Sequence, residues 1–304
     1  MCGLRFYCGR LICLAETELI CLMTPDRQVC TAMPRTPYNP SLRRPIRISG
    51  VNWVGLQTLY LKEVRRFMNV PTQTLLGPVV TAVLFMMVFA VAVGERAGLG
   101  AGNSFVQFLA PGLVMLTVLQ NAFANTSSSI TSAKVQGNIV DVLMPPLGPG
   151  ELLTAMVAAA ITRGVLVASV CVATFWFFDA IILPPDLLMA GLFLLLGASV
   201  MAMAGLIAGI WARKFDHLSA ITNFVVQPLA FLSGTFYSID RLPAPFDTIA
   251  GLNPFFMIID GFRYGMTGLL EGQLLTSVLV TLTINFCLAV LCYRILSSGF
   301  RLKS

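Results

Sequence analysis

Charged side chains are scarce in this sequence. Only 11% of its 304 residues are Asp, Glu, Lys or Arg, whereas a soluble globular domain has about 25%. Hydrophobic residues make up 57%, and the mean hydropathy is +0.82. This composition excludes an ordinary soluble domain and predicts a membrane protein.

Side chains that carry chemistry are also few. His217 is the only histidine, which leaves little for acid–base catalysis at neutral pH. The sequence has no G-x-x-x-x-G-K-[ST] loop for ATP and neither H-E-x-x-H nor G-x-S-x-G. Its eight cysteines include no C-x-x-C pair, the usual start of a zinc site. We therefore expect no catalytic residue, cofactor site or metal site, and interpret the cysteines as buried, unreactive thiols.

The first 50 residues differ from the rest. They contain seven arginines and scattered prolines, and Glu16 and Glu18 interrupt their longest apolar stretch, so no signal-peptide pattern is present. We interpret residues 1–50 as a poorly ordered cytoplasmic extension and residues 51–304 as the membrane domain. Met33 is a plausible alternative start, which would make the extension an artefact of start assignment.

Long apolar segments dominate the remainder. A bilayer-spanning helix needs about 20 mostly apolar residues, and six segments approach that length. The fold class is therefore an all-α membrane protein with six transmembrane helices, expected at about 72–93, 105–127, 151–177, 187–210, 218–237 and 274–296.

The distribution of Lys and Arg predicts the orientation. With the N-terminus inside, 17 of the 20 basic residues lie on the cytoplasmic side and only Arg96, Arg241 and Arg263 outside. Cytoplasmic segments carry the excess of basic residues, so both termini are expected in the cytosol. The basic residues flank apolar segments and form no separate basic surface, which argues against a nucleic-acid partner.

Two further segments have the character of membrane-surface helices. Residues 51–70 alternate apolar and charged side chains near helical spacing, which predicts an amphipathic interfacial helix; a cytoplasmic extension of the first span is the alternative. Between spans five and six, the prolines and short apolar stretches predict re-entrant half-helices after Pro245 and Pro254.

Two polar features interrupt the spans. Arg163 lies about 18 Å along its helix from Glu151; it could line a substrate path, pair within the bundle, or extend toward the cytosolic headgroups. The run from Asn125 to Ser129 is interpreted as the end of the second span.

Three motifs carry a resemblance: KVQGNIVDVLMPPLGPGELL at 134–153, FLSGTFYSIDRLP at 231–243 and LNPFFMIIDGFRYGMTG at 252–268. In this order they are similar to the ABC-2 type transporter permeases, in the bacterial branch of drug-resistance, nodulation-factor and polysaccharide exporters. The resemblance covers about residues 55–300.

The resemblance implies a permease subunit of an ATP-binding-cassette exporter in the bacterial inner membrane. Two permease copies, expected as a homodimer, would work with a separate ATPase that binds ATP and export a hydrophobic or amphipathic substrate. An ATP-independent secondary transporter or channel is the alternative function.

The resemblance also implies which residues contact the ATPase, namely those on the helix before span one and around the first cytoplasmic loop. Proline fixes φ and restricts the residue before it, so this loop is expected to be stiff enough to transmit force. The candidates are Lys62, Glu63, Arg65, Arg66, Lys134, Asp141, Pro145, Pro146 and Glu151. For each charged residue among them, the alternative is a solvated charge at the membrane interface. Arg163 is the substrate-path candidate.

Overall fold

The computed structural model describes residues 50–93, 104–143, 145–181, 184–236, 251, 253–270 and 272–299, together with the backbone of two short strands before them. The chain divides into two units, Met1–Arg47 and Ile48–Ser304. In the first unit, β1 (Ile20–Thr24) pairs antiparallel with β2 (Arg27–Thr31). This hairpin was not expected from the sequence, and the rest of the expected extension lies outside the described residues.

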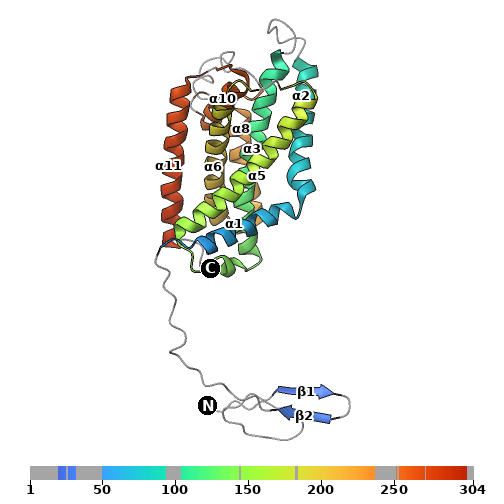
Figure 1. Cartoon of the computed structure of the whole chain (residues 1–304), viewed down its shortest axis with the longest axis vertical. Helices are drawn as coiled ribbons and strands as arrows, with labels where there is room; N and C mark the ends of the chain where they lie inside the picture. Colours follow the sequence, from blue (N-terminus) through green and yellow to red (C-terminus); the bar gives the residue numbers. More distant parts are fainter. Residues whose placement is uncertain are drawn as a thin grey trace. The chain divides into compact units, whose positions relative to one another are not determined.

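Every regular element described in the second unit is a helix, so the all-α prediction is confirmed for the membrane domain. The elements are α1 (Trp53–Met68), the π-helical η2 (Thr72–Leu76), α2 (Gly77–Val93), α3 (Ser104–Val135), α4 (Ile139–Leu143), α5 (Pro149–Phe177), α6 (Leu187–Trp211), α7 (Phe215–Ile221), the π-helical η3 (Thr222–Val226), α8 (Gln227–Phe231), α10 (Pro254–Thr267) and α11 (Leu274–Ser298). Figure 1 shows α1 lying across one end of the bundle and α10 at the other end.

Five described helices are long and apolar enough to cross a membrane, namely Thr72–Val91, Phe105–Val135, Pro149–Phe177, Leu187–Trp211 and Leu274–Ser298. They agree with five of the six predicted spans. The second is longer than expected, because the helix continues well past residue 127.

The sixth predicted span, 218–237, is not confirmed. The structure places a helical run there, but it is interrupted by η3 and ends with α8 at Phe231. The chain then leaves helical geometry, and the Ser233 hydroxyl donates a hydrogen bond to the Ala230 carbonyl at 2.5 Å. The run is thus shorter than the about 20 residues that a span needs.

One of the two predicted half-helices lies within the described residues. α10 begins at Pro254 and is 14 residues long, too short to cross a bilayer. Asn253 caps it, because its side-chain oxygen accepts a hydrogen bond from the Phe255 amide at 3.0 Å. The half-helix after Pro245 lies outside the described residues, and re-entry into the membrane stays a prediction for both.

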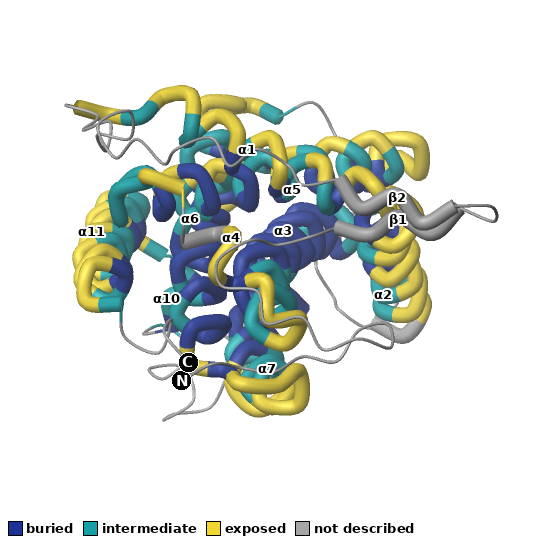
Figure 2. The backbone as a smooth tube through the Cα atoms, turned by 90° about the horizontal axis from the view of Figure 1, so that it is seen from below, coloured by how far each residue is buried: buried dark blue, intermediate teal, exposed yellow. Residues whose placement is uncertain are grey.

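α3 is the central helix of the bundle. Of its most apolar 18-residue window, 78% is buried inside the protein, compared with 22% for the first span and 11% for α11. Figure 2 shows buried backbone along α3 and exposed backbone on α2 and α11 at opposite sides. The two outer helices therefore present most of their apolar surface to lipid or to a partner.

Small residues allow α6 to approach α3 closely. A Cβ at Gly205 would meet the Phe123 carbonyl and the Thr126 hydroxyl, and one at Gly209 would lie 2.9 Å from the Ser127 carbonyl. The Thr126 hydroxyl donates a hydrogen bond across the contact to the Ala202 carbonyl at 2.7 Å. This is the close helix packing that a small-x-x-x-small spacing permits in membranes.

We expect Gly205→Ala to destabilise the protein by about 1–3 kcal/mol, because overfilling a packed contact forces the backbones apart. Gly191→Ala is the matched control on the same helix, since no atom lies within 4 Å of its Cβ position. Thermal unfolding in detergent micelles measures the difference. Equal unfolding midpoints for the two variants would contradict this account of the contact.

Candidate functional site

The half of α3 that faces α1 is unusually polar for a central helix. This α3 polar segment comprises Gln120, Asn121, Asn125, Thr126, Ser127, Ser128, Ser129 and Thr131. Asn125 and Ser127 are each only 1% exposed. The helix continues to Val135, so the interpretation of this run as the end of the span is wrong. Buried polar groups need partners, and the surrounding helices supply them.

A charge pair on α1, the Glu63–Arg66 pair, binds the α3 polar segment. Arg66 Nε lies 3.0 Å from Glu63 Oε2. The Arg66 guanidinium also donates to the Asn125 carbonyl at 2.7 Å and to Ser128 Oγ at 3.2 Å. On the other side, Ser129 Oγ donates to Glu63 Oε1 at 2.9 Å. Glu63 is only 3% exposed, so the pair fixes α1 against α3 and is not a freely solvated surface charge.

Arg163 on α5 approaches the same polar segment. Its Nη2 donates to Asn121 Oδ1 at 2.9 Å, and the Asn121 amide nitrogen donates to the Thr117 carbonyl at 2.9 Å. Among the described residues, Arg163 Nε has no hydrogen-bond partner. Of the three interpretations that the sequence left open, these contacts favour pairing within the bundle.

The proline loop joins the first turns of α1 and α5. Glu151 Oε2 accepts a hydrogen bond from the Gly148 amide at 2.7 Å, and Oε1 accepts one from the Asn52 amide at 2.5 Å. Asn52 also donates from its side chain to the Pro146 carbonyl at 3.3 Å. Since Asn52 and Gly148 precede the two helices, one carboxylate ties both helix N-termini to the loop.

Gly55 allows the loop to pack directly on α1. A Cβ at this position would lie 2.7 Å from Leu147 Cδ2, which is too close for any other residue without a shift. The helix and the loop therefore share a tight contact in addition to the hydrogen bonds of Glu151.

Lys134 binds the end of a neighbouring helix. Its ammonium donates to the carbonyls of Gly209, at 3.1 Å, Ile210 and Ala212, at 3.3 Å. These carbonyls lie at the C-terminal end of α6, where a cation is favourable. Lys134 therefore joins α3 to α6 and is already engaged within the chain.

The other predicted contact residues are on the surface. Lys62, Arg65, Asp141, Pro145 and Pro146 are all exposed. The structure thus divides the predicted set. Glu63, Arg66, Lys134 and Glu151 connect helices, whereas the exposed five remain accessible to another molecule.

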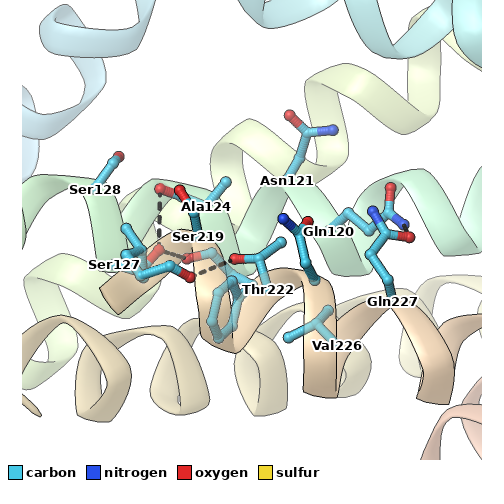
Figure 3. Close-up of a pocket in the computed structure, with 12 residues that line it drawn as sticks. Gln120, Asn121, Ala124, Ser127, Ser128, Ser219, Thr222, Val226 and Gln227 are labelled. Carbon is cyan, nitrogen blue, oxygen red and sulfur yellow. Dashed lines mark hydrogen bonds between the residues drawn. The ribbon is translucent and has the colours of Figure 1, made fainter. Parts of the chain in front are cut away.

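A polar cavity of about 390 Å³ lies between α3 and the α7–η3 run. Figure 3 shows amide and hydroxyl side chains from both walls around it. Its lining comprises Gln120, Asn121, Phe123, Ala124, Ser127, Ser128, Leu218, Ser219, Thr222, Asn223, Val226 and Gln227. The volume lies in the range of small-molecule sites. Asn121 and Ser128 are among these lining residues. Asn121 also accepts a hydrogen bond from Arg163, and Ser128 accepts one from Arg66.

Two residues of the motifs make contacts that the sequence did not indicate. Arg263, which is expected on the outer side of the membrane, is fully buried within the protein and donates to the Gly234 carbonyl at 2.8 Å. Asn253 donates from its side chain to the Leu229 carbonyl at 2.8 Å. Both residues stand in the third motif. Arg263 binds Gly234 of the second motif, and Asn253 binds Leu229 shortly before it.

The site offers hydrogen bonding and positioning. Within the described ranges, no group of three or more His, Cys, Asp and Glu side chains could hold a metal ion. The polar groups of the cavity are amides and hydroxyls, which can both donate and accept.

Comparison with known proteins indicates the same family as the three sequence motifs. A family model described as ABC-2 type transporter matches residues 54–267. The inner membrane transport permease YadH of Escherichia coli (strain K12) is 37% identical over 254 residues, covering 83% of this chain and 98% of that protein. Nodulation protein J of Rhizobium leguminosarum bv. viciae is 24% identical over 227 residues, covering 72% and 83%. The family match includes the Glu63–Arg66 pair, the proline loop and the cavity.

We expect Glu63→Gln to lower the free energy of unfolding by about 1–3 kcal/mol. Arg66 would keep its contacts with α3 but would lose the carboxylate of Glu63 as an ion-pair partner. Arg66 is 34% exposed, so the loss should be smaller than for a fully buried pair. Denaturant unfolding in mixed micelles measures it, with Lys62→Gln on the exposed face as control. The interpretation fails if both variants unfold like the parent protein.

Proposed function

Because this chain belongs to the ABC-2 type transporter family, we propose that it is the permease subunit of an exporter driven by a separate ATPase. It is a multi-pass protein of the inner membrane. In this proposal it carries a hydrophobic or amphipathic substrate out of the cytosol, and the ATPase subunit binds and hydrolyses ATP.

The observation that carries the proposal is the junction of α1, the proline loop and α5. Pro145 and Pro146 are exposed and accessible to another protein. The backbone behind them is held by Glu151 and Asn52. A stiff, exposed loop fixed to two helices can pass a movement of a bound ATPase into the bundle, whereas a loose loop would absorb it.

A continuous set of contacts leads from this junction to the cavity. α1 begins at the loop. Further along the helix it carries Arg66, which binds Asn125 and Ser128 on α3. Ser128 lines the cavity. A rotation of α1 would therefore be transmitted to the cavity wall through these hydrogen bonds and not through a flexible segment of the chain.

We assign the cavity to the substrate path. Its mixed lining of amides, hydroxyls and a few apolar side chains suits an amphipathic molecule. Arg163, the substrate-path candidate, contributes indirectly, since it holds Asn121 in the cavity wall.

The proposed topology has six crossings. The run Phe215–Phe231 with the residues after it forms the fifth crossing, and α10 is a half-helix that enters from the outer side. The excess of Lys and Arg on the α1 side supports a cytosolic location for both termini. A second copy of the chain completes the permease, and the poorly buried surfaces of α2 and α11 leave room for it and for lipid.

Purification from native membranes tests the proposal directly. We expect an ATPase with a Walker A loop to co-purify with the tagged chain. Inside-out vesicles that contain both proteins should accumulate a fluorescent amphiphilic dye when ATP is added. Dye movement that survives ATP depletion, with no ATPase bound, would instead support the secondary transporter or channel.

The double variant Pro145→Gly, Pro146→Gly should uncouple ATP hydrolysis from dye transport. Each change removes a restriction of the backbone that is worth about 0.4–1 kcal/mol of conformational free energy. The more flexible loop would then bend and would not transmit a movement of the ATPase. Membrane insertion and co-purification should be unchanged.

Pro184 provides a control, because it is a proline of a different connection, the one before α6. The corresponding glycine variant there should keep transport coupled. Normal export by the Pro145, Pro146 variant would show that the loop is only a turn.

A further inference from the structure

Arg263 is the largest fully buried side chain among the described residues. It lies on α10, at the end of the bundle away from α1 (Figure 1). Its guanidinium carbon stands 3.8 Å from the centroid of the Phe108 ring on α3, a cation–π distance. Its Nη2 donates to the Gly234 carbonyl, in the segment after α8, at 2.8 Å. A single side chain therefore connects three separate parts of the bundle.

Asp260 extends this contact to a fourth part. It is fully buried one helical turn before Arg263, and its Oδ1 lies 3.9 Å from Arg263 Nη1. Its Oδ2 accepts a hydrogen bond from the Gly272 amide at 2.9 Å, directly before α11. The Arg263–Asp260 pair thus holds together α3, α10, the segment after α8 and the approach to α11.

Close backbone packing shows that this arrangement is specific. A Cβ at Gly112 on α3 would lie 3.2 Å from Thr235 Cγ2 and 3.4 Å from Arg263 Nη2. Gly112 therefore lets the segment after α8 lie flat against α3, with Arg263 beside it. Thr235 itself is fully buried in this contact.

A buried ion pair is poorly suited to adding stability, because apolar residues of similar size often stabilise as well or better. Its distinct property is reversibility. Charged groups regain hydration when the contact opens to water, whereas apolar groups lose their only favourable environment. A contact that must open and close repeatedly, such as that of Arg263 with Phe108 and Gly234, is therefore better served by a buried charged side chain than by an apolar seal.

An existing cavity lies beside the contact. It has a volume of about 240 Å³ and is lined by residues that include Pro111 on α3, Pro185 before α6, and Met266 and Thr267 on α10. Movement of α10 away from α3 would enlarge this space. Pro111 interrupts the helical hydrogen bonding of α3 at this level, which provides a bending point.

We propose that Arg263 is a positioning residue that holds α10 and the Ser233–Phe236 segment closed against α3, and that release of its contacts opens the end of the bundle away from α1. The role in substrate release rests on the proposed function. The closure itself needs neither ATP nor a partner and is measured separately.

Cysteine accessibility tests the closure. Every native cysteine except Cys171 is replaced by serine, and Thr235→Cys is introduced as the reporter. The protein in lipid nanodiscs is treated with a charged maleimide, and labelling at each position is followed by mass spectrometry. Cys171 is fully buried in the main core and reports whether the fold is intact.

With Arg263 present, the thiol at position 235 should react slowly. Arg263→Met, which keeps an unbranched apolar stem but is shorter and loses the charge and the hydrogen bonds, should raise its labelling rate about tenfold, equivalent to about 1.4 kcal/mol, while Cys171 stays protected. Arg263→Lys should give an intermediate rate, because it keeps the charge but not the planar donor fork. Arg213→Met, at an exposed position, is the control and should leave both rates unchanged.

Two results would overturn the proposal. Protection of position 235 in Arg263→Met would show that Arg263 only fills space. Equal exposure of position 235 and Cys171 in both Arg263 variants would show a general contribution to stability and no local closure. Neither depends on ATP, so a failure of the exporter assignment leaves this measurement valid.

Discussion

The Glu63–Arg66 pair is the contact on which the arrangement of the α1 end of the bundle depends. Glu63 is buried and Arg66 is partly exposed, and together they bind the backbone and side chains of α3, the central helix. The polar segment of α3 would be costly inside a membrane protein if its groups were unpaired. Because α1, α5 and α6 supply its partners, the same polar residues that would weaken an isolated span fix the relative positions of four helices.

This arrangement gives the two ends of the bundle different properties. At the α1 end, carboxylates and guanidiniums tie helices into one unit whose outer edge, at Pro145 and Pro146, is accessible. At the other end, Arg263 and Asp260 hold short segments that are broken by prolines and glycines. The polar cavity lies beside α3, next to Asn121 and Ser128. A movement applied at the rigid end can therefore be expressed at the end built from short, separable pieces.

Much of the fold could be predicted because length and hydropathy determine spans directly. Five of six crossings and the helix after Pro254 agree with the structure. The run Phe215–Phe231 fell short because its end depends on Ser233 and Gly234, which a hydropathy window averages away. The candidate functional site was harder to predict from the sequence. Asn125–Ser129 resembles a helix end by composition, and only the facing Glu63, Arg66 and Ala202 explain how a helix can continue through it. The burial of Arg263 was also not predicted, because no sequence pattern marks its contacts with Phe108 and Gly234.

Because Glu63 and Arg66 bind α3 directly, we expect α1 and α3 to move as one body when the proposed ATPase acts. This expectation can be tested with cysteines at positions 63 and 129, whose present side chains touch at 2.9 Å, in a background without other thiols. ATP-driven dye transport is measured before and after a short thiol-to-thiol cross-linker is added. Transport should be weak before cross-linking, because the Glu63 contacts are lost, and should recover afterwards. A cross-linked protein that hydrolyses ATP but no longer transports dye would show that α1 must move relative to α3, and would contradict the account.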